Sequence, residues 1–123
     1  MGTLTVSEAA VTTGLSAHTL RYYERIGLLN PIGRAESGHR NYSEFDIGWI
    51  EFLKCLRATG MPIRQMKQYV DAQREGDHTL TDRLQILKEH RSSVLERIGE
   101  LTRYLETIDH KIRYYSDQKE KSR

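Results

Sequence analysis

Residues 5–26 read TVSEAAVTTGLSAHTLRYYERI, and this stretch decides the fold. Thr5 and Glu8 have the spacing of a capping box, in which the threonine hydroxyl and the glutamate carboxylate satisfy unpaired amides at a helix start. A short helix is therefore predicted to begin near Val6. It should end at Gly14, because a residue without a Cβ tolerates the left-handed conformation that follows a helix.

A second short helix is predicted directly after this turn. The Ser16 hydroxyl can cap its first turn. The helix should run to about Ile26, since Gly27 stops it and Pro31 prevents any continuation. Two short helices joined by a glycine-containing turn form a helix-turn-helix. The apolar residues expected between the two helices are Ala9, Ala10, Val11, Leu15 and Leu20.

Residues 32–42, IGRAESGHRNY, follow the second helix and carry a hairpin signal. Ser37 and Gly38 lie between two short stretches of extended character, which is a pattern typical of a hairpin turn. We therefore expect a two-stranded wing beside the helix-turn-helix.

Two further helices are predicted after the wing. Ser43 and Asp46 can cap the third helix, which should end at Gly60. Its apolar stripe has helical spacing and consists of Phe45, Trp49, Phe52, Leu53 and Leu56. Pro62 is expected to open the fourth helix at its first position, where the missing amide hydrogen costs nothing, and this helix should fade at Gly76.

From Leu80 onward the apolar residues are spaced alternately four and three residues apart, with a gap at Arg91. This heptad pattern predicts a helix of about 36 residues, roughly 54 Å long. Most of its apolar seam has no partner within so short a chain, so it should bury against a second copy. The predicted dimer interface consists of Leu84, Leu87, Val94, Ile98, Leu101, Leu105, Ile108 and Ile112.

The predicted fold is thus mainly α, with a winged helix-turn-helix domain at 1–76 and a dimerisation coiled-coil helix with its tail at 77–123. A chain of 123 residues has room for one modest core and one appended element. No run of eighteen apolar residues occurs, and the N-terminus lacks the pattern of an export signal, so we expect a cytoplasmic protein. The single cysteine, Cys55, fits a reducing compartment.

The formal net charge of +2 is too small to indicate a nucleic-acid partner, so that case depends on where the polar groups lie. The second predicted helix carries cationic and hydroxyl groups at Ser16, His18, Thr19, Arg21, Tyr22 and Tyr23. Such groups donate to phosphate oxygens and reach base edges in the major groove. The same pattern also suits a solvated face, on which Arg21 and Arg25 pair with Glu24 and one tyrosine packs inward. The wing favours DNA binding, because it adds a second set of donors at Arg34, His39, Arg40 and Tyr42.

Three segments carry a resemblance to a known family: residues 19–29 (TLRYYERIGLL), residues 38–43 (GHRNYS) and residues 56–63 (LRATGMPI). With Pro31 and Arg34 between them, they resemble the MerR family of bacterial transcription regulators. The ordered match spans residues 3–75 and is followed by a long dimer helix like that of the family.

This resemblance implies a homodimer with antiparallel dimer helices that binds a pseudo-palindrome between promoter elements of unusually long spacing. It also implies activation by bending and untwisting this DNA, so that RNA polymerase can engage both elements. The residues that match the family's main DNA-contacting positions are Arg21, Tyr22, Tyr23, Arg40 and Tyr42. Thr19 and His18 are candidates for base readout. Arg64 either helps to hold a phosphate at the start of the fourth helix or is an ordinary surface arginine.

The resemblance leaves the effector open. Metal-sensing members carry cysteines around the dimer helix, whereas residues 76–123 contain none, so we expect no soft-metal site and no cofactor. The histidines there and on the approach to the helix are expected to be solvated or packed. Cys55 is either a small buried hydrophobe or a sensor thiol activated by Lys54 or Arg57. The sequence around it, Lys-Cys-Leu-Arg, resembles that of the family members that respond to aldehydes, nitric oxide or related thiol stress.

Other function classes predict different features. A coiled-coil adaptor that binds only protein would explain the heptads but not the donors of the wing. A regulator with a non-covalent small-molecule or metal effector would share the DNA-binding surface but not the sensor thiol. An enzyme would need a nucleophile motif, and a single thiol with scattered histidines does not form one, so we expect no enzymatic activity.

Overall fold

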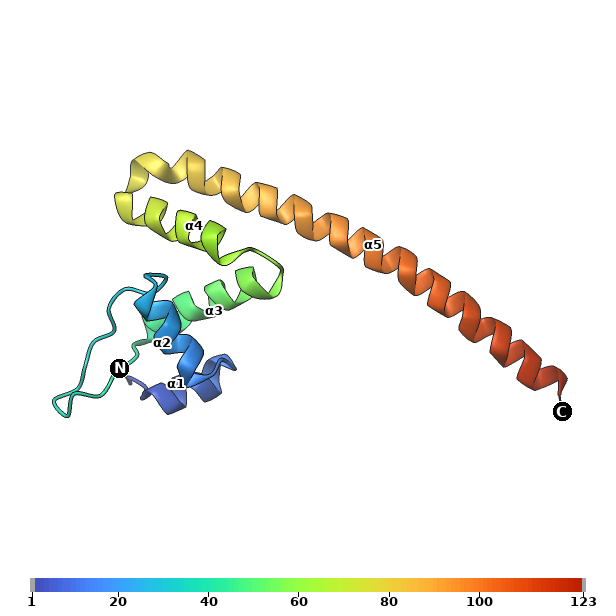
Figure 1. Ribbon diagram of the computed structural model, residues 1–123, viewed down its shortest axis with the longest axis horizontal. Coiled ribbons are helices and arrows are strands. Elements are labelled where there is room, and N and C mark those ends of the chain that lie inside the picture. The colour runs from blue at the N-terminus through green and yellow to red at the C-terminus, as the bar shows by residue number, and fades with distance from the viewer. Residues whose placement is uncertain (1, 123) are drawn as a thin grey trace. The chain divides into compact units, whose positions relative to one another are not determined.

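The computed structural model describes residues 2–122. Its elements are, in chain order, α1 (Val6–Thr13), α2 (Ala17–Arg25), α3 (Glu44–Ala58), α4 (Ile63–Glu75), the 3₁₀ helix η1 (Asp77–Thr79) and α5 (Leu80–Lys121) (Figure 1). All five predicted helices are present, which confirms the mainly α fold with a long C-terminal helix. The chain divides into two compact units, Met1–Arg83 and Leu84–Arg123, so this division falls beyond the predicted boundary after residue 76.

Local side-chain bonds set the helix starts as predicted. The Thr5 amide donates to Glu8 Oε1 at 2.8 Å, and the Glu8 amide donates back to Thr5 Oγ1 at 3.2 Å. Ser43 and Asp46 form the same reciprocal pair at 2.9 and 3.1 Å. The Ser16 hydroxyl accepts the amide three residues further on at 3.0 Å. Each cap pairs amides that a helix start otherwise leaves without a partner.

A lysine from α3 holds the turn between α1 and α2. Gly14 adopts a φ of 76°, in the left-handed region that suits glycine. The Lys54 ammonium donates to the Thr13 carbonyl oxygen at 2.6 Å, at the end of α1 where unpaired carbonyls favour a cation. Lys54 therefore ties α3 to the helix-turn-helix.

The core of the first unit lies where its four α-helices and their connections meet. α1 contacts α2 and α3, and α3 contacts α4 (Figure 1). The buried apolar side chains are Ala9, Leu20, Tyr23, Leu28, Leu29, Ile32, Tyr42, Ile50, Leu53, Leu56, Met61, Met66 and Val70. Two residues expected in the apolar stripes are instead exposed, Val11 at 84% and Phe45 at 71%.

The wing forms a hairpin, but not the two-stranded sheet that was predicted. Within residues 2–122 only isolated antiparallel bridges occur, between Arg34 and Arg40 and between Leu4 and Tyr42. The Ala35 amide donates to the His39 carbonyl at 2.9 Å inside the hairpin. Residues 33–39 are all exposed, so the hairpin has little apolar surface to bury, and an isolated two-stranded hairpin is marginal in water.

Two helix boundaries differ from the prediction. Pro62 is the N-cap residue and not the first helical residue of α4, which begins at Ile63. α5 has 42 residues, compared with the roughly 36 expected from the heptads, because the polar tail after Tyr115 contains good helix formers and no Gly or Pro. Among the residues that the structure describes, no helix is both long enough and apolar enough to cross a membrane.

Candidate DNA-binding surface

The second helix of the helix-turn-helix separates its core face from its polar face. On α2, Leu20 and Tyr23 are buried. The polar residues His18, Arg21, Tyr22 and Arg25 recur every three or four positions, so they lie along the opposite side of the helix. All of these four are exposed except Tyr22, which is half-buried. Arg25 lies over the Tyr22 ring, with 5.3 Å between its Cζ and the ring centroid. This face therefore offers cationic and hydroxyl donors to a partner.

Ser16 and Thr19 are occupied with each other at the start of α2. The Ser16 hydroxyl donates to Thr19 Oγ1 at 2.9 Å and accepts the Thr19 amide at 3.0 Å. Ser16 is thus the helix cap. Thr19 follows His18 on α2. A contact between a DNA base and the Thr19 methyl or hydroxyl group stays a prediction.

Two of the four wing donors, Arg34 and His39, are exposed and form local hydrogen bonds. Arg34 Nη1 donates to the Gly38 carbonyl at 3.0 Å, which braces the hairpin turn from within. His39 Nδ1 and the Ser37 hydroxyl are 3.1 Å apart. Both Arg34 and His39 lie on an exposed segment, as a wing along a DNA backbone requires.

Glu24 of α2 connects the helix to the wing. Its Oε1 accepts Arg40 Nε at 2.7 Å, and its Oε2 accepts the Ile32 amide at 3.1 Å. Burial would raise the pKa of the Glu24 carboxyl, but the bonds from Arg40 and Ile32 and the nearby arginine charges lower it on balance. The sequence hypothesis that Glu24 pairs with Arg21 and Arg25 is therefore wrong, because its ion-pair partner is Arg40.

Arg21 and Arg40 bring the two sets of donors together. Both line a groove of about 610 Å³ beside the wing and the start of α1. Both also line a second groove of about 450 Å³, together with His18 and Arg25. Helix and wing cations therefore share one surface, which is the arrangement that a phosphate backbone requires.

Two predicted donors lie in the core instead. The Tyr42 side chain is 0% exposed and the Tyr23 side chain 5%, and burial raises the pKa of both phenols. Tyr23 is on the core face of α2. The Tyr42 backbone exchanges two hydrogen bonds with Leu4, at 2.7 and 2.8 Å, and is thereby held against the start of α1. The Tyr42 hydroxyl is fully buried, which corrects the prediction that it donates to DNA. Tyr23 retains 5% exposure, and a DNA contact by its hydroxyl stays a prediction.

Arg64 is exposed in the first turn of α4. Pro62, the N-cap residue, makes no side-chain bond to that turn. The placement is compatible with a phosphate contact, which stays a prediction.

Cys55 is exposed on α3, which contradicts the interpretation as a small buried residue. The two neighbouring cations donate to backbone carbonyls: Lys54 to that of Thr13 at 2.6 Å and Arg57 to that of Met61 at 3.4 Å.

No group of three or more His, Cys, Asp or Glu side chains in residues 2–122 is placed to hold a metal ion.

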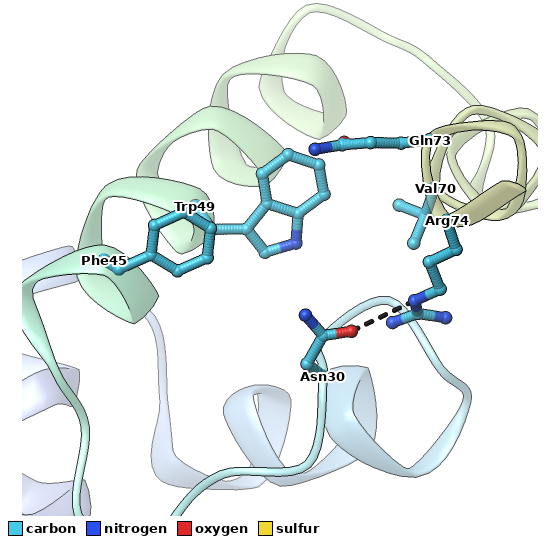
Figure 2. Close-up of a pocket in the computed structure, with 6 residues that line it drawn as sticks. All are labelled: Asn30, Phe45, Trp49, Val70, Gln73 and Arg74. Atoms are coloured by element: carbon cyan, nitrogen blue, oxygen red, sulfur yellow. Dashed lines mark hydrogen bonds between the residues drawn. The ribbon is translucent and has the colours of Figure 1, made fainter. Parts of the chain in front are cut away.

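A pocket of about 220 Å³ between α3, α4 and the segment after α2 was not foreseen from the sequence. Figure 2 shows Trp49 and Phe45 along one side and Arg74 reaching Asn30, with 3.1 Å between Nε and Oδ1. The Trp49 indole donates to the Leu28 carbonyl at 2.9 Å. These bonds anchor the end of the helix-turn-helix to α3 and α4.

Comparison with known protein families identifies the family of this chain. The family described as "MerR HTH family regulatory protein" matches residues 4–73, and "MerR, DNA binding" matches residues 47–111. The chain belongs to the MerR family. It is a MerR-type DNA-binding transcription regulator.

Similar MerR-type proteins cover most of the chain. The HTH-type transcriptional regulator AdhR of Bacillus subtilis is 44% identical over 93 residues, which are 76% of this chain and 66% of AdhR. An HTH-type transcriptional regulator of Haemophilus influenzae is 37% identical over 117 residues, 95% of this chain and 87% of its own length. The solved structure of HiNmlR, a MerR family regulator lacking the sensor domain, bound to promoter DNA, has a TM-score of 0.86 at 37% identity and covers 95% of this chain and 93% of HiNmlR.

Replacing Tyr42 by Phe tests its assignment to the core. The Tyr42 hydroxyl is buried and has no hydrogen-bond partner among the described residues, and such a group costs on the order of 1–3 kcal/mol. Tyr42→Phe should therefore leave the free energy of unfolding unchanged or raise it, as measured by urea denaturation, and should leave DNA affinity near the wild-type value. Tyr22→Phe, on the exposed side of α2, should weaken DNA binding. If Tyr42→Phe weakened DNA binding equally, Tyr42 would be a DNA contact after all.

Proposed function

We propose that this chain acts in the cytoplasm as a homodimer that binds a pseudo-palindromic operator within a long-spacer promoter. It switches transcription by distorting the operator DNA for RNA polymerase, and it has no enzymatic role. The observation that carries the proposal is the surface on which Arg21 of α2 and Arg40 of the wing line the same grooves. The similarity to HiNmlR, whose crystal structure contains promoter DNA, supports it.

The long helix supports the homodimer. No residue of α5 is buried within its own chain. Its seam residues Leu84, Ile98, Leu101, Leu105, Ile108 and Ile112 are exposed, and Leu87 and Val94 are partly exposed. Burying a large apolar side chain contributes about 1.5–3 kcal/mol, so this strip gains stability by packing against a second copy. The family resemblance supports an antiparallel arrangement of the two helices.

A dimer supplies the geometry for DNA distortion. Two identical heads related by a two-fold axis fit two half-sites of a pseudo-palindrome. A change in the angle between the heads changes the twist or bend of the DNA between the half-sites, which carries a deformation energy. RNA polymerase then meets promoter elements in a different relative orientation.

Cys55 is the proposed sensor of aldehyde, nitrosative or other thiol stress. Its exposure allows an electrophile to reach the sulfur. The Lys-Cys-Leu-Arg context and the similarity to AdhR support this assignment. An adduct adds bulk to the surface of α3, the helix that Lys54 links to the helix-turn-helix. Packed helices respond to such a change by shifting as units.

The first test of the proposed function concerns the dimer seam. Replacing Leu101 and Leu105 by Asp should place charges in the buried strip and give monomers by analytical ultracentrifugation, with loss of operator binding. Arg103→Asp is the matched control, because it changes the net charge by the same amount on the opposite face of α5. A double variant that still sediments as a dimer would show that the seam is misassigned.

The second test separates phosphate contacts from base readout. Arg21→Gln should weaken binding to operator and random DNA alike and reduce the salt slope by about one, since it removes one phosphate contact. His18→Ala and Thr19→Ala should change the preferred base pairs at nearly constant salt slope. Arg113→Gln on α5 controls for the lost charge. Equal losses on operator and random DNA for His18 and Thr19 would remove both residues from base readout.

The third test concerns Cys55. A Cys55→Ser protein should bind its operator with near wild-type affinity, because the substitution is nearly isosteric and the side chain is exposed. Its promoter should no longer respond when cells are exposed to an aldehyde or a nitrosating agent, as measured with a transcriptional reporter. Induction that survives the substitution would point to a non-covalent effector near residues 55–78.

A further inference from the structure

We propose that Glu24 is a positioning residue for DNA binding: its carboxylate locks the wing onto α2, so that Arg40 and Arg21 face the same stretch of DNA backbone. The inference rests on the proposed function, because it assumes that Arg40 contacts phosphate. Glu24 itself is not expected to touch DNA, since its two oxygens are already occupied and a carboxylate repels phosphate.

The carboxylate holds both arms of the wing at once. Oε2 accepts the amide of Ile32, where the wing segment begins, at 3.1 Å. Oε1 accepts Nε of Arg40, near the end of that segment, at 2.7 Å. Because both bonds converge on one side chain of α2, they fix the base of the hairpin against this helix. The hairpin needs such a fixed point, since its backbone forms only isolated bridges within residues 2–122 and the Arg34 bond to Gly38 braces only its turn.

The contact also orients the Arg40 guanidinium. Arg40 uses Nε for Glu24, and its two terminal Nη groups make no hydrogen bond to any residue from 2 to 122. These nitrogens are the fork with which arginine binds phosphate in a bidentate manner. Holding the guanidinium plane through Nε leaves this fork available in the grooves that Arg21 also lines.

Partial burial makes the ion pair between Glu24 and Arg40 harder to separate than an ordinary surface ion pair. The side chains of Arg40 and Glu24 are only 26% and 16% exposed. Solvent screens an exposed pair to a small contribution, whereas a partly buried and hydrogen-bonded pair resists separation.

A charge-only account and a positioning account predict opposite results for Glu24→Gln. Removing a negative charge beside a phosphate-binding surface should raise DNA affinity if only charge matters. The positioning account predicts about a tenfold loss of operator affinity and a salt slope flatter by about one, as expected when one phosphate contact is lost. Glu36→Gln is the matched control, because Glu36 is an exposed wing carboxylate. It should not weaken binding.

The Glu24→Asp variant is a second test that separates the positioning role of the carboxylate from the effect of its charge. It keeps the charge but withdraws the carboxylate from the wing, so it should weaken binding as Glu24→Gln does, whereas a charge-only role predicts no change. Thermal melting followed by circular dichroism establishes that each variant is folded at the assay temperature. If Glu24→Gln does not fold, Glu24→Asp carries the test.

A double-mutant cycle with Arg40 completes the experiment. Arg40→Gln should weaken binding of the wild-type dimer about tenfold but should have little further effect in the Glu24→Gln background. Arg21→Gln should have nearly the same effect in both backgrounds. Additive effects of Glu24→Gln and Arg40→Gln would overturn the positioning role and leave the proposed function standing. If Arg40→Gln left affinity and salt slope unchanged, Arg40 would not contact DNA, and both the wing contact and this inference would be overturned.

Discussion

Mutual burial of short helices is the constraint on which the first unit depends. α1 has 8 residues and α2 has 9, and isolated helices shorter than about 12–15 residues are marginal in water. Neither helix of the helix-turn-helix is therefore expected to persist alone. Ala9, Leu20 and Tyr23 are buried, and α1 contacts both α2 and α3, so packing within the first unit keeps these helices ordered. The donors on the outer face of α2 owe their fixed spacing to this burial.

A small number of polar bonds then place the donor-bearing segments. Lys54 of α3 pairs with the end of α1, and the Trp49 indole of α3 pairs with the segment after α2. Glu24 of α2 pairs with the wing. Each of these bonds satisfies a group that burial would otherwise leave costly and unpaired. They convert a loosely specified hairpin and two short helices into one surface with cations at defined places.

The long helix α5 is stabilised in a different way from the helices of the first unit. Its residues form an α-helix of 42 residues with an exposed apolar seam, so its own chain provides the helix but not the burial. Such a seam gains stability only from a second surface of the same periodicity. In the proposed homodimer, this one contact would supply both the two-fold symmetry and the burial of the seam.

Local patterns determined much of this protein from sequence alone. The capping pairs Thr5 with Glu8 and Ser43 with Asp46 join residues three apart, so the spacing in the sequence already specifies the bond. The heptad spacing of α5 and the polar face of α2 are local in the same sense. The family resemblance followed from the order of short segments.

Tertiary structure alone decided the remaining features, because they depend on residues far apart in the chain. Arg40 lies 16 residues from Glu24, and Lys54 lies 41 residues from Thr13, so no local pattern distinguishes these partners from other charged or polar neighbours. The burial of Tyr42 depends on its pairing with Leu4, and the exposure of Cys55 depends on which side of α3 the other helices cover. Sequence periodicity specifies which residues share a face, whereas packing decides which face is covered and which cation meets which carboxylate.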